Sequence, residues 1–203
     1  MNFISNILFW ISTGLLVPVI VLLIFFFVRA LILLGGFFGH YMQMRKVNAA
    51  LDKKIATLTV DTLGEFEKSL PAESQAPVLE YMRKITLEKN NHARIDMLLS
   101  EYEIEADKNL GLSKTLTKMG PILGLMGTLI PMGPALVGLA AGDIGSMAYN
   151  MQVAFATTVV GLVASAIGFV TQTNKERWYV KDMAMLEYVA EIVKQSSKKS
   201  RVI

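Results

Sequence analysis

The sequence contains no cysteine and only two histidines among its 203 residues. Without thiols, the chain has no disulfide and no thiolate metal site. His40 and His92 lie far apart in the sequence, and neither is paired with a carboxylate at the spacing of metal ligands. The residues therefore predict no metal site and no cofactor.

Catalytic motifs are missing as well. The chain has no Gly-Lys-Ser/Thr phosphate loop, no Gly-x-Ser-x-Gly turn and no His-Glu-x-x-His. Two long stretches, 119–142 and 144–173, contain no carboxylate, ammonium, guanidinium or imidazole group. These absences argue against an enzyme, so no catalytic residue is predicted. They also leave the chain without a proton carrier of its own in either stretch.

Long apolar stretches take the place of such motifs. The chain is 53% hydrophobic with a mean hydropathy of +0.44, and 18% of its residues are charged. This balance is typical of a membrane protein with one modest aqueous part. The uncharged start of the chain lacks the basic region and cleavage site of a signal peptide, so we predict a retained first crossing at roughly residues 7–28. Its helix should continue past Arg29 and break at Gly35, Gly36 or Gly39.

A second apolar region extends from Met119 to Gln172 and contains one charged residue, Asp143. Asp143 lies between two apolar runs, each long enough to cross a bilayer, which predicts a transmembrane hairpin. All 20 Lys and Arg residues lie in two blocks, 29–118 and 175–201. By the positive-inside rule both blocks are cytoplasmic, so the N-terminus and the hairpin tip face outward. Three crossings are the smallest number that fits.

The predicted fold class is all-α, with three transmembrane helices and a helical cytoplasmic part. We expect a first transmembrane helix in 1–40, a cytoplasmic helical region in 41–117, the hairpin in 118–173, and a cytoplasmic helix and tail in 174–203. The last helix carries an apolar stripe: Tyr179, Met183, Leu186, Ala190 and Val193. Such a stripe has to pack, either on the 41–117 helices or on a neighbouring subunit. The acidic residues between 101 and 107 are spread around a helix, which predicts a solvated surface.

Both arms of the hairpin carry a face of small residues. On the first arm they are Pro121, Gly124, Thr128, Pro131, Ala135 and Gly138, and on the second Ala154, Thr158, Gly161, Ser165 and Gly168. Small faces let helix backbones approach closely, and their hydroxyls face protein or water in preference to lipid. Ordinary packing is the alternative, with each threonine hydroxyl bonded to a carbonyl one turn back. Pro131 and Pro134 free backbone carbonyls and should bend the first arm.

Two runs in the hairpin resemble a known family. GPILGLMGT at 120–128 is similar to the aPxLGLxGTv signature of the MotA/TolQ/ExbB proton channel family, and AFATTVVGL at 154–162 is similar to its AxxxTxxGL signature. Order, spacing and membrane context agree, and the resemblance covers about half of the chain. Two positions depart from the family pattern, because Pro131 stands where most relatives have Gly, and Val153 where many have Glu.

The resemblance implies a subunit of a rotary motor in the inner membrane, driven by the proton or sodium gradient. Family members form a pentamer around a dimer of a single-span partner of the ExbD/TolR/MotB type, whose membrane Asp carries the ion. The implied ion-pathway residues are Thr128 and Thr158, with Thr157 and Ser165 beside them. The implied packing and bending residues are Pro121, Gly124, Gly127, Pro131, Pro134, Gly161 and Gly168. Membrane lipid is a further expected partner, and no nucleic-acid partner is expected. The alternative is a membrane scaffold that recruits a partner without transporting ions.

Overall fold

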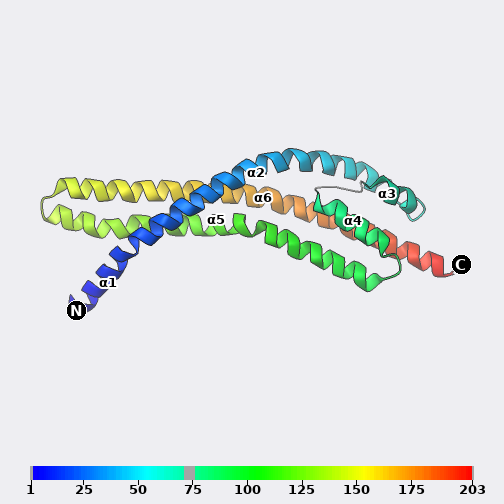
Figure 1. Cartoon of the computed structure of the whole chain (residues 1–203), viewed down its shortest axis with the longest axis horizontal. Helices are drawn as coiled ribbons and strands as arrows, with labels where there is room; N and C mark the ends of the chain where they lie inside the picture. The colour runs from blue at the N-terminus through cyan, green and yellow to red at the C-terminus, as the bar shows by residue number, and fades with distance from the viewer. Residues whose placement is uncertain (1, 71–75, 203) are drawn as a thin grey trace. The chain divides into compact units, whose positions relative to one another are not determined.

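The structure is a computed structural model that describes residues 2–70 and 76–202 (Figure 1). Within these ranges it contains α-helices and no strand, which confirms the predicted all-α class. The helices are α1 (Asn2–Gly14), α2 (Leu16–Ala56), α3 (Leu63–Ser69), α4 (Pro77–Leu87), α5 (His92–Ala140) and α6 (Ile144–Val202). Three stretches are long and apolar enough to cross a membrane: Asn6–Gly39, a part of His92–Ala140 and a part of Ile144–Lys198. The chain is therefore a multi-pass membrane protein.

The first candidate crossing differs from the prediction in two ways. It is interrupted between α1 and α2 at Leu15, because Pro18 has no N–H to donate to the Gly14 carbonyl and its ring crowds that carbonyl. The break predicted at the later glycines is wrong, since α2 runs unbroken to Ala56. Each glycine costs a helix only about 1 kcal/mol, which the good helix formers around the three glycines can offset.

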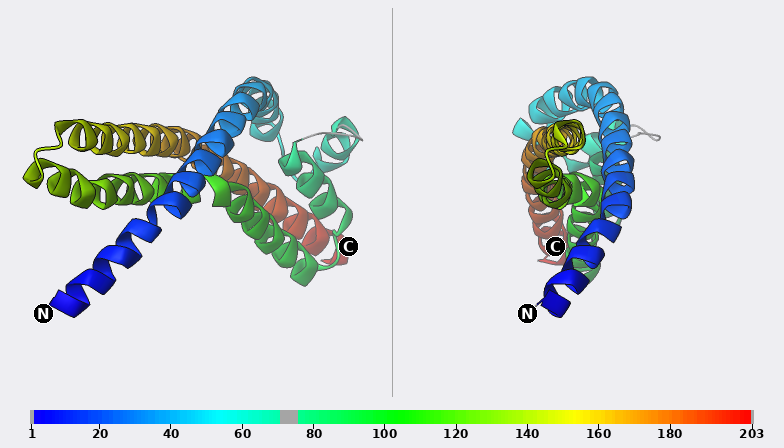
Figure 2. Two further views of the ribbon diagram at one scale, coloured as in Figure 1. Left: turned by 60° about the vertical axis from the view of Figure 1, so that its left-hand side comes forward. Right: turned by 90° about the vertical axis from the view of Figure 1, so that its left-hand side faces the viewer.

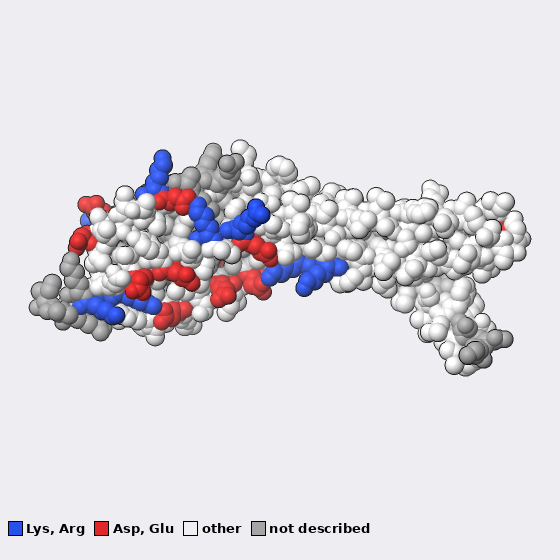
Figure 3. All heavy atoms as spheres, turned by 180° about the vertical axis from the view of Figure 1, so that it is seen from behind, with Lys and Arg blue, Asp and Glu red and all other residues white. Residues whose placement is uncertain are grey.

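The chain divides into two compact units. Unit 1 consists of Met1–Gly36 and Gly111–Thr173, and unit 2 of Phe37–Leu110 and Asn174–Ile203. In the view of Figure 3, charged side chains gather over the helices of unit 2, and the hairpin of unit 1 is almost free of them. The boundaries predicted at residues 40, 117 and 173 separate membrane segments from aqueous segments. The two units are defined by packing and do not test where the membrane begins, so those boundaries stay predictions.

The hairpin of unit 1 turns within three residues between α5 and α6 (Figure 2). Gly142, two residues after the end of α5, has a φ of 73°, which favours glycine, and its N–H donates to the Leu139 carbonyl. The Asp143 N–H donates to the Gly138 carbonyl, which completes a Schellman motif. The Asp143 carboxylate then accepts the Ser146 N–H at 2.9 Å and caps α6. The one acidic residue of the hairpin thus has a structural role.

Unit 2 is a helical bundle with its own apolar core. Leu186, Val189 and Val193 of α6 are fully buried and pack with residues of α4 and α5 such as Ile85 and Leu98. The apolar stripe predicted on the last helix therefore packs on helices of its own chain. The tail predicted at the end of 174–203 is helical as far as Val202.

Candidate ion-pathway site in the hairpin

Glycines bring the two arms of the hairpin into backbone contact. A Cβ added at Gly161 would lie 2.6 Å from the Gly120 carbonyl oxygen and 3.0 Å from the Gly124 Cα atom. At Gly168 an added Cβ would lie 2.8 Å from both the Leu116 Cβ atom and the Thr117 nitrogen. No side chain fits at either position, so α5 and α6 approach as closely as their backbones allow.

This contact gives the small faces a use inside one subunit. Gly124, Gly161 and Gly168 are buried between the arms of the same hairpin. The family resemblance implies contacts between copies of the chain, but the small faces can be explained by the contact within one hairpin alone. Thr128, Thr158 and Ser165 are only half-buried, which leaves part of each side chain at the surface of the hairpin.

Pro121 creates a second kind of contact between the arms. A proline has no N–H, so it cannot donate the usual helix hydrogen bond to the carbonyl four residues earlier, which is that of Thr117. The Ser165 hydroxyl of α6 donates to this carbonyl at 3.0 Å. The structure thus gives Ser165 a partner within the hairpin and links it to Pro121 of the signature.

A double substitution tests this link. Ser165→Ala should destabilise the hairpin by about 1 kcal/mol, because the Thr117 carbonyl then lacks both donors. Pro121→Ala restores a helix N–H, so Ser165→Ala should cost much less in the Pro121→Ala background. Melting temperatures of the purified chain and its three variants measure the coupling. Simple additivity of the two substitutions would contradict the link.

Thr128 and Thr158 come together from opposite arms. The Thr128 hydroxyl donates to the Leu125 carbonyl at 2.7 Å and lies 3.4 Å from the Gly124 carbonyl oxygen. The Thr158 hydroxyl lies 3.1 Å from the carbonyl oxygen of Ala154 and 3.3 Å from that of Gly124. Both hydroxyls therefore converge on one backbone oxygen. They form a small polar site between the two arms of the hairpin.

Thr157 occupies a different position from Thr158. It is 6% exposed, and its hydroxyl donates within α6 to the carbonyls of Val153 and Ala154 at 3.0 and 2.9 Å. Its side chain packs against Gly127, where an added Cβ would lie 2.6 Å from the Thr157 hydroxyl oxygen. The Thr157 hydroxyl thus shares the Ala154 carbonyl with Thr158, but its hydrogen bonds do not reach the Gly124 carbonyl on which Thr128 and Thr158 converge.

The remaining prolines lie inside an unbroken helix. Pro131 is buried and Pro134 half-buried, and α5 continues past both to Ala140. Neither proline can donate to the carbonyl four residues earlier, so the carbonyls of Gly127 and Ile130 lose their usual helix donors. These two oxygens lie on the turn next to Thr128, where they add polarity to the first arm.

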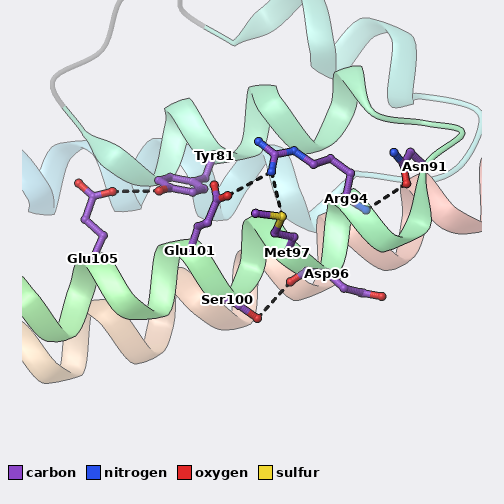
Figure 4. Close-up of polar contacts among 8 residues, drawn as sticks. All are labelled: Tyr81, Asn91, Arg94, Asp96, Met97, Ser100, Glu101 and Glu105. Carbon is purple, nitrogen blue, oxygen red and sulfur yellow. Dashed lines mark hydrogen bonds and ion pairs between the residues drawn. The ribbon is translucent and has the colours of Figure 1, made fainter.

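Unit 2 holds the polar contacts that sequence reasoning missed. Asp182 of α6 is fully buried and accepts a hydrogen bond from the Tyr102 hydroxyl at 3.0 Å. The acidic residues between 101 and 107 are at least partly exposed, as predicted; Glu105 accepts the Tyr81 hydroxyl at 3.0 Å and Glu101 pairs with Arg94 at 3.1 Å (Figure 4). A signal for the first contact was available, because Asp182 is on the same helical face as the apolar stripe of α6.

Comparison with known proteins agrees with the hairpin motifs. The family model of the MotA/TolQ/ExbB proton channel family matches residues 72–186, more than half of the chain. No curated protein matches the chain. The chain belongs to the MotA/TolQ/ExbB proton channel family, and it is an ion-channel-type motor subunit. Proton channels and motor components of this kind are not a known class of enzyme. In the ranges that the structure describes, no group of three His, Asp or Glu residues could hold a metal ion.

Proposed function

We propose that the chain is the channel subunit of an energy-transducing rotary motor, in which Thr128 and Thr158 form the polar contact for an ion-carrying carboxylate. The observation that carries the proposal is the convergence of both hydroxyls on the Gly124 carbonyl. Each side chain is partly exposed on the hairpin, so each can reorient toward a partner. Hydroxyl groups can donate to a carboxylate and accept from a carboxylic acid, which suits a group that gains and loses a proton.

The carboxylate has to come from another chain. The hairpin of this subunit contains no acidic residue between Met119 and Gly142 or between Ile144 and Thr173. A single-span partner of the ExbD/TolR/MotB type with an Asp at membrane depth would supply it. Burial raises the pKa of such an Asp toward neutrality, so it can bind and release protons. One charge moving through 100 mV yields about 2.3 kcal/mol, enough to bias steps between packed states.

The proposed assembly is a homopentamer around a dimer of that partner in the cytoplasmic membrane. A ring of copies would place the half-buried threonines around a narrow lumen, with the exposed apolar side chains of α1 and α2 available to lipid. The ion is a proton or Na⁺, and the hydroxyl chemistry serves either.

Reconstitution of the chain in liposomes distinguishes the proposed channel subunit from the alternative, a membrane scaffold that does not transport ions. The chain is placed in liposomes that contain a pH-sensitive dye, with and without the single-span protein encoded beside it. A membrane potential should drive proton entry, or Na⁺ entry followed with a sodium dye, when both proteins are present. A scaffold, in which the threonine hydroxyls only satisfy backbone carbonyls, would give no flux of either ion.

The predicted orientation, with the hairpin tip outside and unit 2 in the cytoplasm, implies a pattern of cysteine labelling. Because the chain has no cysteine, a single introduced one is its sole thiol. Ala141→Cys at the exposed hairpin tip should react with a membrane-impermeant maleimide in intact cells, or in spheroplasts if an outer membrane is present. Ser69→Cys, at an exposed position in unit 2, should react only after permeabilisation. The reverse pattern would overturn the proposed topology.

A further inference from the structure

One buried acid of unit 2 has no place in the ion pathway. Asp182 lies on α6 with no exposed surface, and only its Oδ2 atom has a partner, the Tyr102 hydroxyl. Its Oδ1 atom is buried without a hydrogen-bond partner among the described residues. An ionised carboxylate with an empty acceptor atom in an apolar core is costly, and a neutral carboxylic acid is much less so.

Among the side chains that the structure describes, the groups that surround Asp182 do not neutralise it. From α5 it meets Tyr102, with Glu105 one turn further; from α4, the Tyr81 ring packs edge-on against Tyr102 at 5.3 Å and its hydroxyl donates to Glu105. On α6 itself, the Tyr179 ring lies 6.4 Å from the Tyr102 ring. The adjacent Lys181 is exposed, and its ammonium group is paired with Asp52 of α2.

We propose that Asp182 is a proton-binding site of unit 2, at which uptake of one proton from the cytoplasmic water stabilises the packing of α6 against α5. Protonation removes the buried charge and leaves the hydrogen bond with Tyr102 in place. A carboxylic acid and a phenol hydroxyl can each act as donor or acceptor in that bond. The site is separate from the hairpin threonines, and the proposal stands whether or not the chain carries ions.

The direction in which pH changes the stability of unit 2 follows from the proton affinities of Asp182 in the folded and the unfolded chain. Burial raises the pKa of Asp182 from 3.8 to about 6, against the opposing effects of the Tyr102 hydrogen bond and of Lys181. The folded chain therefore binds this proton about 100-fold more tightly than the unfolded chain. The resulting stabilisation is complete below pH 3.8 and is lost as the pH rises through about 6. Acidification of the cytoplasm toward pH 6 thus tightens unit 2, and recovery of neutral pH loosens it.

Melting temperatures of the full chain in detergent, measured from about pH 5 to about pH 7.5, test the proposal. The wild type should melt several degrees higher at the acidic end. Asp182→Asn should remove much of that difference by raising the melting temperature at neutral pH, because an amide is never charged. Glu187→Gln, an exposed position of the same helix, is the matched control and should leave the profile unchanged.

Tyr102→Phe separates proton binding from a purely structural role. It removes the hydrogen bond that favours the charged form, so the midpoint of the pH profile should move to higher pH. The infrared band of a protonated carboxyl group, recorded against pH on wild type and Tyr102→Phe, should move in the same direction. A wild-type profile that Asp182→Asn leaves intact, or a midpoint that Tyr102→Phe does not move, would overturn the proposal.

Discussion

Replacing Thr158 by valine should leave the subunit folded and assembled while reducing ion-driven flux about tenfold or more. Valine keeps the shape of the side chain and replaces the hydroxyl group by a methyl group. If that hydroxyl solvates the partner's carboxylate, its loss costs about 1 to 3 kcal/mol, and 1.4 kcal/mol corresponds to a factor of ten in rate. Flux into liposomes that contain the subunit and its single-span partner measures the effect.

The contacts of Thr158 explain why the fold of the subunit should survive the substitution by valine. The hydroxyl lies near the carbonyls of Ala154 and Gly124, and each of these already has the backbone N–H four residues later as a regular helix donor. No carbonyl is left empty when the hydroxyl is removed. Ser165 differs in this respect, because the Thr117 carbonyl it serves has no N–H donor from Pro121.

Thr157→Val is the matched control, because it makes the same chemical change one residue away. The Thr157 hydroxyl is buried and donates within α6, and its hydrogen bonds do not reach the Gly124 carbonyl on which Thr128 and Thr158 converge. Its loss should therefore reduce flux much less. Native mass spectrometry of both variants reports assembly. Loss of the oligomer together with flux in Thr158→Val would assign Thr158 to packing, and full flux in both variants would exclude the threonines from the mechanism.

Hydropathy and charge were enough to predict the three apolar stretches and the all-α class, because a bilayer demands long uncharged helices. The exact course of the helices depended on local backbone chemistry. The interruption at Leu15 follows from Pro18, which the sequence interpretation did not consider. The expected break at Gly35 to Gly39 did not occur, because a helix tolerates exposed glycines that nothing crowds.

The candidate site was predictable to the level of the helix face. The motifs placed Thr128 and Thr158 on small faces, and the structure brings the two together. Periodicity could not say what those faces contact, because close approach looks the same within a hairpin and between subunits. Asp182 was missed because the stripe on α6 was identified by its apolar residues. The position of Asp182 on that face was visible in the sequence, but its partner Tyr102 lies 80 residues away, so helical periodicity could not identify the contact.

Gly161→Ala should destabilise the subunit by about 1 to 3 kcal/mol, and Gly161→Leu by more. The added Cβ would lie 2.6 Å from the Gly120 carbonyl oxygen and 3.0 Å from the Gly124 Cα atom. Both are backbone atoms, which cannot rotate aside as a side chain would, so α5 and α6 must separate along the hairpin. The melting temperature of the purified chain should fall by several degrees.

Gly111→Ala is the matched control for this effect. An added Cβ at Gly111 of α5 meets no atom within 4 Å, so alanine should gain helix propensity of up to about 1 kcal/mol without a clash. The two substitutions are chemically identical and should shift the melting temperature in opposite directions.

Comparison of Gly161→Ala and Gly111→Ala in a detergent that keeps the chain monomeric also locates the contact of the small faces. If those faces served only contacts between copies, Gly161→Ala would leave the monomer unchanged and weaken the oligomer alone. A fall in the stability of the monomer would instead place the contact inside each hairpin, which leaves the half-buried threonines, and not the glycines, available to face the lumen.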